Sequence, residues 1–255
     1  MKIIQDFTVK NVEWLNDENY IIEFQTDNEI PELKPGNFAE IEISNSAEVF
    51  LRRPFSVFDF NKYEKSITFY VKVIGKGTRA LGMMNKGERT SIIYPLGNSF
   101  GMVDEGPVLM VGGGSGIAPF LTLGREFMHK GIEMKFLIGG RSEKDILFYD
   151  ALNPFGEVFV TTEDGSMGIK GMVTDHPALK ENVTEFKKIY TCGPDPMMKA
   201  IAKLSQENNI ECEASLENMM ACGFGACLCC VTETKDGNKC VCTDGPVFNV
   251  KDLAW

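Results

Sequence analysis

Histidine is nearly missing from this chain, and the two present, His129 and His176, stand at neither metal-ligand nor catalytic-triad spacing. A His-ligated metal site and a His-dependent triad are therefore not expected. Basic residues are also in deficit, with 26 Lys and Arg against 36 Asp and Glu, a formal net charge of −10. This balance argues against a surface that coats phosphates, so nucleic acid is excluded as the expected partner.

Among the first residues there is no long apolar core and no small-residue cleavage site of the kind that marks a secretion signal. We therefore expect a cytoplasmic protein. The nineteen residues between Glu105 and Arg125 carry no charge, but six glycines and two prolines interrupt them. A strand, a glycine loop and a helix explain this stretch better than a membrane span does.

Periodicity changes near residue 101 and again near residue 212. Up to about Phe100, short β-rich runs alternate with turn residues, as in residues 20–24, 39–43, 66–73 and 89–94, which predicts an antiparallel barrel. From Val108 the pattern is buried strand, loop and helix, with strands expected at 108–111, 135–138, 158–161 and 188–191, which predicts a parallel sheet. We expect three domains, 1–101, 102–211 and 212–255, the last too small to bury much core and organised around a metal.

The cysteines are grouped, with six of the eight between Cys222 and Cys242. In a cytosolic chain such grouping favours metal ligation over a disulfide framework. Cys222, Cys227 and Cys230 have the C-x4-C-x2-C spacing of plant-type ferredoxins, and a fourth cysteine would complete the ligands of a 2Fe-2S cluster. Spacing alone chooses neither between Cys240 and Cys242 nor between Cys229 and Cys230. Structural zinc and plain buried thiols are the competing readings.

A flavin site is suggested by two segments of the predicted barrel. Arg53-Pro54-Phe55-Ser56 places a guanidinium beside a short hydroxyl, which suits a pyrophosphate and a flavin ring. By itself this match is weak, and a surface Arg with a structural Ser explains it better. The glycine turn Gly75–Leu81, which follows a strand, adds a second phosphate-binding candidate and favours the flavin.

A dinucleotide site is suggested by two segments of the predicted parallel sheet. The run Gly112–Pro119, with Gly113, Gly114 and Gly116, joins an apolar strand to a helix, although Ile117 occupies the third glycine position of the regular motif. Cys192 and Gly193 end the fourth expected strand, where open parallel sheets bind ligands. A structural glycine turn and a buried small thiol are the alternatives.

These segments, in this order, resemble the ferredoxin–NADP reductase superfamily. The run Met220–Cys230, with Cys242 to Phe248, narrows the resemblance to the electron-transfer subunits of dihydroorotate dehydrogenase B. The resemblance implies Cys242 as the fourth ligand, leaving Cys229 and Cys240 as extra thiols. It also implies FAD contacts at the following residues: Arg53, Pro54, Phe55, Ser56, Tyr70, Val71, Lys72, Gly77 and Thr78.

The resemblance further implies an activity and a partner. Electrons would pass from NADH through FAD and the 2Fe-2S cluster to an FMN-containing catalytic subunit that oxidises dihydroorotate in pyrimidine synthesis, in a heterotetramer of two plus two subunits. No catalytic acid, base or nucleophile of this chain is required, because the cofactors carry the electron chemistry. The residues alone contain no dihydroorotate site.

Three other functions remain possible at this level. One is a related flavin and iron–sulfur reductase subunit that serves a ferredoxin- or sulfur-dependent complex. The others are an electron carrier or redox sensor without nicotinamide binding, and a zinc-stabilised structural protein. The choice between NADH and NADPH is also open, because Arg141 and Ser142 suit a 2′-phosphate while the family resemblance favours NADH.

Overall fold

The computed structural model describes residues 2–255, and their contacts group into two compact units. The barrel unit comprises the chain up to Ser99 together with Asn218–Thr232 and Lys239–Pro246. The sheet unit comprises Phe100–Glu217, Glu233–Asn238 and Val247–Trp255. Residues after 211 are thus divided between the two units, and a separate third domain, like the three-domain division itself, stays a prediction.

The barrel unit is built on a curled antiparallel sheet of seven strands in the order β4-β3-β7-β1-β2-β6-β5. Their bounds are β1 Ile3–Asn16, β2 Asn19–Gln25, β3 Phe38–Ile41, β4 Arg53–Ser56, β5 Asp59–Asn61, β6 Ser66–Lys72 and β7 Arg89–Leu96. Every β-rich run named from the sequence lies on one of these strands, which confirms the antiparallel barrel-like fold. Alternate residues point into the barrel because successive side chains of a strand face opposite sides.

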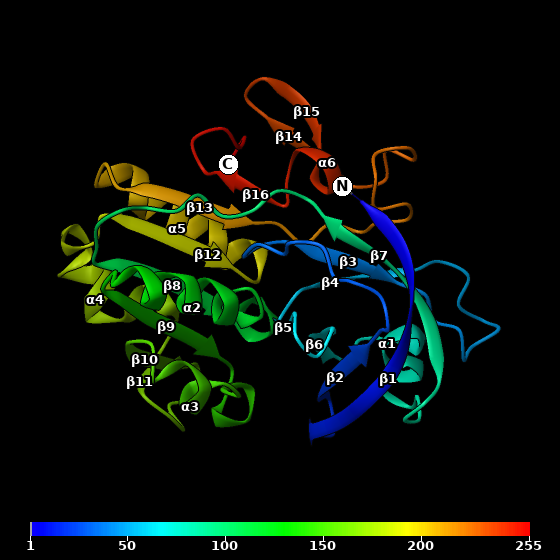
Figure 1. The fold of residues 1–255 in the computed structure, drawn as a ribbon. Coiled ribbons are helices and arrows are strands. Elements are labelled where there is room, and N and C mark those ends of the chain that lie inside the picture. The colour runs from blue at the N-terminus through cyan, green and yellow to red at the C-terminus, as the bar shows by residue number, and fades with distance from the viewer. Residues whose placement is uncertain (1) are drawn as a thin grey trace. The chain divides into compact units, whose positions relative to one another are not determined.

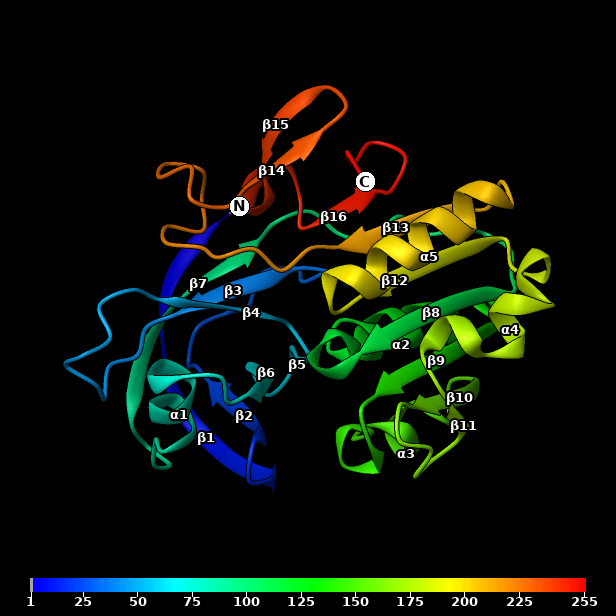
Figure 2. The same cartoon turned by 180° about the vertical axis from the view of Figure 1, so that it is seen from behind.

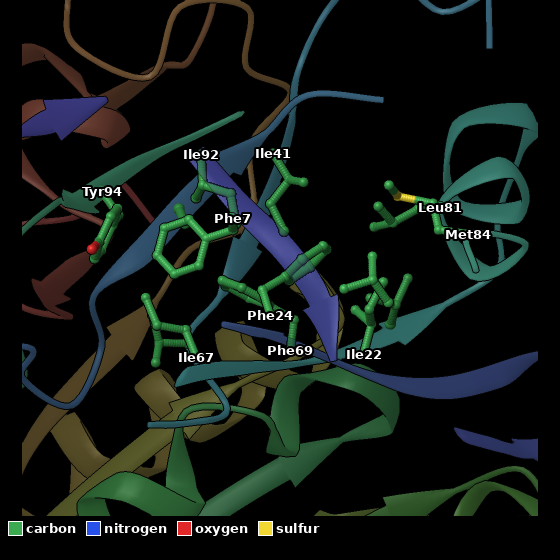
Figure 3. Close-up of a cluster of buried hydrophobic side chains, with 14 of the residues drawn as sticks. Phe7, Ile22, Phe24, Ile41, Ile67, Phe69, Leu81, Met84, Ile92 and Tyr94 are labelled. Carbon is green, nitrogen blue, oxygen red and sulfur yellow. The ribbon is translucent and has the colours of Figure 1, made fainter. Parts of the chain in front are cut away.

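The interior of the barrel is filled by aromatic and branched side chains from several strands, among them Phe7, Phe24 and Phe69 (Figure 3). Leu81, from helix α1 (Lys76–Gly82), joins this core together with Met84 just beyond the helix. The core therefore holds α1, and with it the Gly75–Leu81 turn, against the barrel.

The sheet unit contains a second seven-stranded sheet in the order β11-β10-β9-β8-β12-β13-β16. Its strands are β8 Val108–Gly113, β9 Met134–Gly140, β10 Glu157–Thr162, β11 Ile169–Lys170, β12 Lys188–Cys192, β13 Glu211–Ser215 and β16 Val247–Asn249. All neighbours pair in parallel except β13 and β16. The four strands expected from the sequence are β8, β9, β10 and β12, which confirms the parallel sheet.

Helices cover both faces of this sheet. They are α2 Phe120–Lys130, α3 Tyr149–Leu152, α4 Pro177–Lys180 and α5 Asp195–Glu207, with short 3-10 turns η1 Gly114–Ile117, η2 Glu143–Asp145, η3 Val173–Asp175 and η4 Val183–Glu185. Helix α2 lies on the face shown in Figure 1 and α5 on the face shown in Figure 2. Right-handed crossovers place α2 and α5 on opposite faces, because the chain passes from β8 to β9 toward one edge of the sheet and from β12 to β13 toward the other. The direction of winding therefore reverses between β8 and β12.

The uncharged stretch between Glu105 and Arg125 forms β8, η1 and the start of α2. Each of these elements is far too short to cross a bilayer. In the part of the chain that the structure describes, no helix combines the length and the apolarity that a membrane span requires.

Two cysteine-rich stretches, Asn218–Thr232 and Lys239–Pro246, belong to the barrel unit. This part of the chain forms a small hairpin, β14 Val231–Thr234 with β15 Gly237–Cys240, and the single turn α6 Val241–Asp244. The Asn98 amide bonds the Asp244 carbonyl at 3.0 Å, and the Asn98 backbone N–H donates to the Gly245 carbonyl at 2.7 Å. These bonds fasten the segment to the end of β7.

Candidate redox cofactor sites

The Arg53–Ser56 motif forms β4, an edge strand of the barrel sheet, paired with β3 on one side only. An edge position accommodates Pro54, which has no backbone N–H to give to a second neighbour. Cross-strand partners point to the same side of a sheet. Pro54 pairs with Glu40 and Ser56 with Phe38, so these four side chains share the outer face of the barrel.

The structure separates the roles of the two adjacent arginines. Arg52 donates to the Ser91 carbonyl at 2.5 Å and to its hydroxyl at 3.0 Å, and lies 3.9 Å from Glu42. Arg53 donates from Nη1 to the Leu51 and Arg52 carbonyls, and it makes no ion pair within residues 2–255. Arg52 therefore anchors the strand to β7, whereas the guanidinium of Arg53 is not held by an acidic side chain of the described residues.

Arg53 lies against the glycine turn, as a single phosphate site would require. A Cβ placed on Gly77 would lie 3.1 Å from Arg53 Nε, so a larger residue would push the guanidinium away. The Thr78 hydroxyl is occupied inside the turn, accepting from the Ile74 and Gly75 N–H groups at 3.0 and 3.2 Å. If Thr78 contacts a phosphate, its backbone N–H must make the contact. The structure thus brings together Arg53 and Gly77, which the sequence analysis named separately.

Tyr70, Val71 and Lys72, named from the family resemblance, end strand β6. Val71 is buried in the barrel core, and the Tyr70 hydroxyl bonds Asn19 at 2.8 Å. β2 pairs with β6 up to Lys72, whereas the pairing of β5 stops at Thr68. The inward direction of Val71 excludes its side chain from a site outside the barrel, so a cofactor contact there must use the backbone.

Both candidate nicotinamide segments meet at the carboxyl edge of the parallel sheet. β8 and β12 are neighbours, with Cys192 paired to Gly112. A Cβ on Gly116 would lie 2.2 Å from the Cys192 carbonyl oxygen, and one on Gly193 would lie 2.8 Å from the Gly113 carbonyl oxygen. Only glycine permits this approach of two backbones. The site lies where the winding direction reverses, which is where open α/β sheets bind their ligands.

Cys192 is fully buried at the end of β12. Burial, together with the charge of Glu217 nearby, raises the pKa of its thiol well above the usual value, although a bond with Ser215 opposes the shift. The thiol is therefore neutral and not a nucleophile. Its place at the ligand-binding edge of the sheet keeps it a candidate for contact with the nicotinamide ring.

Arg141 and Ser142 follow β9, one strand further from the reversal point. The Arg141 side chain is 71% exposed and lies 3.9 Å from Asp145, whose carboxylate accepts from the Ser142 N–H at 3.1 Å. The loop thus presents a cation and a carboxylate together. This arrangement leaves the choice between NADH and NADPH open.

The four cysteines named as cluster ligands gather within the barrel unit. The Cys242 N–H points at Cys230 Sγ at 3.4 Å, and the Cys229 N–H points at Cys227 Sγ at 3.4 Å. The pKa of Cys222 falls to about 6, because N–H groups of Phe224, Cys227 and Ala226 outweigh the opposing effect of burial. Backbone donors that favour a thiolate are the surroundings that a cluster sulfur needs.

Burial distinguishes the competing cysteines. Cys230 and Cys242 are 2% and 1% exposed, whereas Cys229 is exposed and Cys240 partly so. Burial and the adjacent Cys230 thiol raise the pKa of Cys242, so a metal is needed to remove its proton. These observations favour Cys230 over Cys229 and Cys242 over Cys240 as ligands.

The donor set fits a two-iron cluster better than a single ion. Among the described residues, no three Cys, His, Asp or Glu side chains converge on one metal position. A 2Fe-2S cluster does not require such convergence, because four thiolates are shared between two irons. Cys222 lies beside Cys227, and Cys230 lies beside both Cys242 and Cys240, so the arrangement can supply two thiolates to each iron.

One residue of this region was not found from the sequence. Glu40 is completely buried on β3, and neither carboxylate oxygen has a hydrogen-bond partner in residues 2–255. Burial, and secondarily the Cys222 thiolate, raise its pKa to about 7, against the lowering effect of Arg52 and Arg53. In the sequence it is an ordinary polar residue in the alternating run 39–43, so no local signal marks it.

The C-terminal part of the chain, residues 217–254, matches the iron–sulfur cluster binding domain of dihydroorotate dehydrogenase B. Residues 110–203 match the oxidoreductase NAD-binding domain. Both matches cover segments assigned above to these cofactors.

Similar proteins span nearly the whole chain. The dihydroorotate dehydrogenase B (NAD(+)) electron transfer subunit of Fusobacterium nucleatum is 38% identical over 226 residues, 86% of each chain. That of Caldanaerobacter subterraneus is 40% identical over 225 residues, 87% of each chain.

Solved structures with the same fold include the NADH-dependent reduced ferredoxin-NADP oxidoreductase of flavin-based electron bifurcation. It has a TM-score of 0.87 and 28% identity, and the match covers 98% of this chain and 90% of that one. The ferredoxin reductase in carbazole 1,9a-dioxygenase, at 22% identity and a TM-score of 0.71 over 82% of this chain and 67% of that one, shares the fold. The reductase fold, the two matching domains and the full-length relatives lead to one conclusion: this chain belongs to the family of dihydroorotate dehydrogenase B electron transfer subunits.

Proposed function

We propose that this chain is the electron-transfer subunit of a dihydroorotate dehydrogenase B, moving electrons between NADH/NAD+ and a catalytic partner subunit in pyrimidine biosynthesis. The observation that carries the proposal is the gathering of Cys222, Cys227, Cys230 and Cys242 in a chain of this family. FAD, when bound, exchanges electron pairs with nicotinamide, and the 2Fe-2S cluster exchanges single electrons.

The residues of this chain bind and orient the cofactors. We assign Arg53 to the FAD pyrophosphate, because its guanidinium makes no ion pair among residues 2–255 and lies against Gly77. Pro54 and Ser56 face outward on β4, where they can line the flavin ring. Gly113, Gly114 and Gly116, with Cys192 and Gly193, form the nicotinamide site at the sheet edge.

The remaining details follow from the family. The partner is an FMN-containing subunit that oxidises dihydroorotate, the assembly contains two copies of each subunit, and the complex is cytoplasmic. NADH is the preferred nicotinamide. These statements are proposals that rest on the names of the relatives and on the resemblance of the motifs.

The test begins with the chain purified without air. Two irons, two sulfides and one FAD per chain, with flavin bleaching on addition of NADH, are the expected results. The chain is then mixed with the catalytic subunit of the same organism, and dihydroorotate-dependent reduction of NAD+ is measured. Activity that needs both proteins supports the proposal, whereas a colourless protein containing zinc refutes it.

A second function is favoured by one comparison. The structural likeness to the NADH-dependent reduced ferredoxin-NADP oxidoreductase extends over 98% of this chain. A reductase subunit that serves a ferredoxin-dependent complex would therefore have the same fold and cofactors. The two functions separate in the same assay, because the second gives NADH-dependent reduction of ferredoxin and no oxidation of dihydroorotate.

A further inference from the structure

Glu40 is a buried carboxyl group whose partner is not in the protein. Its side chain is 0% exposed, and neither oxygen accepts or donates a hydrogen bond among residues 2–255. Leaving a buried polar group unsatisfied is unfavourable, and more so for a charge. A group of this kind in a folded protein calls for a partner such as a ligand.

The two arginines closest to Glu40 along the chain, Arg52 and Arg53, do not supply that partner. Arg52 is bonded to Ser91 and lies near Glu42, and Arg53 bonds the Leu51 and Arg52 carbonyls. Neither makes an ion pair with Glu40. Burial disfavours the ionised form of Glu40 more strongly than the charges of Arg52 and Arg53, neither of which bonds the carboxylate, favour it.

The cysteine-rich loop covers the Glu40 carboxyl. Ala39 and Ile41 point into the barrel core, so Glu40 points outward. A Cβ on Gly223 would lie 2.6 Å from Glu40 Cγ and 3.2 Å from Oε1. The Cys222 thiolate is near enough to interact electrostatically with the carboxyl. Glu42, two residues further along the same face, is not covered and remains 52% exposed.

The same outer face carries two residues of the flavin motif, Pro54 and Ser56. Glu40 is the cross-strand partner of Pro54, and Phe38 is the partner of Ser56. The Glu40 side chain thus lies beside Pro54 on the neighbouring strand and is covered by the Cys222–Gly225 loop. A cluster held by Cys222 brings sulfur acceptors to this place, and a neutral carboxyl has an O–H to donate.

We propose that Glu40 is a positioning residue of the 2Fe-2S cluster, donating a hydrogen bond from its carboxyl to a sulfur at the Cys222 end and thereby raising the cluster's reduction potential. The inference rests on the cluster of the proposed function. Reduction adds negative charge to the cluster, and a hydrogen bond to sulfur stabilises that charge. The bond also holds the Cys222–Gly225 loop against β3.

Three variants of the FAD- and cluster-containing chain test this proposal. Glu40→Leu removes the donor, Glu40→Gln keeps an N–H donor of similar size, and Glu42→Gln is the matched control at the exposed position just past the end of β3. The cluster potential is measured by a redox titration followed by EPR. In Glu40→Leu we expect the reduced-to-oxidised ratio at a given potential to fall about tenfold, which corresponds to about 59 mV for one electron. Glu40→Gln and Glu42→Gln stay near the parent protein.

Each result decides between support and refutation. An unchanged potential in Glu40→Leu refutes the proposal, and so does a rise of tens of millivolts in Glu40→Gln, which would reveal a carboxylate charge in place of a donated bond. If Glu40→Leu fails to retain iron, pulsed EPR in H2O and D2O still decides by comparing the exchangeable protons coupled to the cluster in the parent and in Glu40→Gln. Identical couplings in the two proteins refute the donated bond, because its O–H would have been replaced by an N–H. Absence of iron and sulfide from the parent protein would instead refute the proposed function.

Discussion

Replacing Gly116 with Ala should damage the nicotinamide site by a defined steric clash. The added Cβ would lie 2.2 Å from the carbonyl oxygen and 2.4 Å from the carbonyl carbon of Cys192, and 2.5 Å from the Cα of Gly193. All three are backbone atoms, so no side chain can rotate away. Ordinary contact distances for carbon are about 3.5 Å, so the two loops must separate by roughly 1 Å.

The cost follows from this displacement. Overpacking of this kind destabilises a protein by about 1–3 kcal/mol. A shift of about 1 Å at a site that positions a reactant lowers the rate by about a hundredfold. We therefore expect Gly116→Ala to lower kcat/KM for flavin reduction by NADH by between tenfold and a hundredfold, while the chain retains its FAD and iron.

The assay is anaerobic stopped-flow reduction of the flavin at several NADH concentrations, with unfolding followed by circular dichroism. Gly131→Ala is the control, because Gly131 has a φ of +69° but open space where its Cβ would be. This variant should lose about 1 kcal/mol of stability from backbone strain and keep its NADH kinetics. Wild-type kinetics in Gly116→Ala would refute the close approach of the two loops.

Three further predictions follow from the sites. Arg53→Ala should weaken FAD binding by about tenfold or more, since a charged hydrogen bond contributes about 1.5–3 kcal/mol. Arg52→Ala should retain FAD and unfold more easily, because Arg52 bonds Ser91. Equal loss of FAD in both variants would contradict the assignment. Cys242→Ser should lose the cluster and Cys240→Ser should keep two irons and two sulfides, as iron analysis will show; the reverse result would exchange their roles. Burial lowers the pKa of His176 below 6.5, and its neutral ring caps α4 by accepting from the Ala178 N–H. The sheet unit should therefore be most stable above pH 6.5 and lose stability as the pH falls toward 5 and the ring takes up a proton. His176→Asn keeps a capping acceptor but does not titrate, so it should reduce the loss of unfolding free energy between pH 7 and pH 5.5 by up to about 1 kcal/mol. Urea unfolding at the two pH values measures this loss. An unchanged pH dependence would exclude His176 as its source.

Local patterns in the sequence determined most of the fold. Alternation in runs such as residues 66–73 and the buried run 108–111 are short-range signals, and the strands form where these signals occur. The cysteine spacing likewise predicted a cluster, because three of its four ligands lie within nine residues of each other. Spacing could not choose between Cys240 and Cys242, because both can reach the same place along the chain.

Only the tertiary structure decided which of two similar residues does what. Arg52 and Arg53 are adjacent and chemically identical, yet the pairing of β3 with β7 brings Ser91 to the first, while α1 brings Gly77 to the second. Glu40 and Glu42 occupy equivalent positions in the alternating run 39–43, so the local pattern does not distinguish them. A loop from more than 180 residues away buries Glu40 and leaves Glu42 in solvent. The sequence by itself determined where strands, turns and candidate thiol ligands lie, because these depend on neighbours along the chain. The tertiary structure decided which side chains are buried and which partners they have, because these depend on contacts between distant segments.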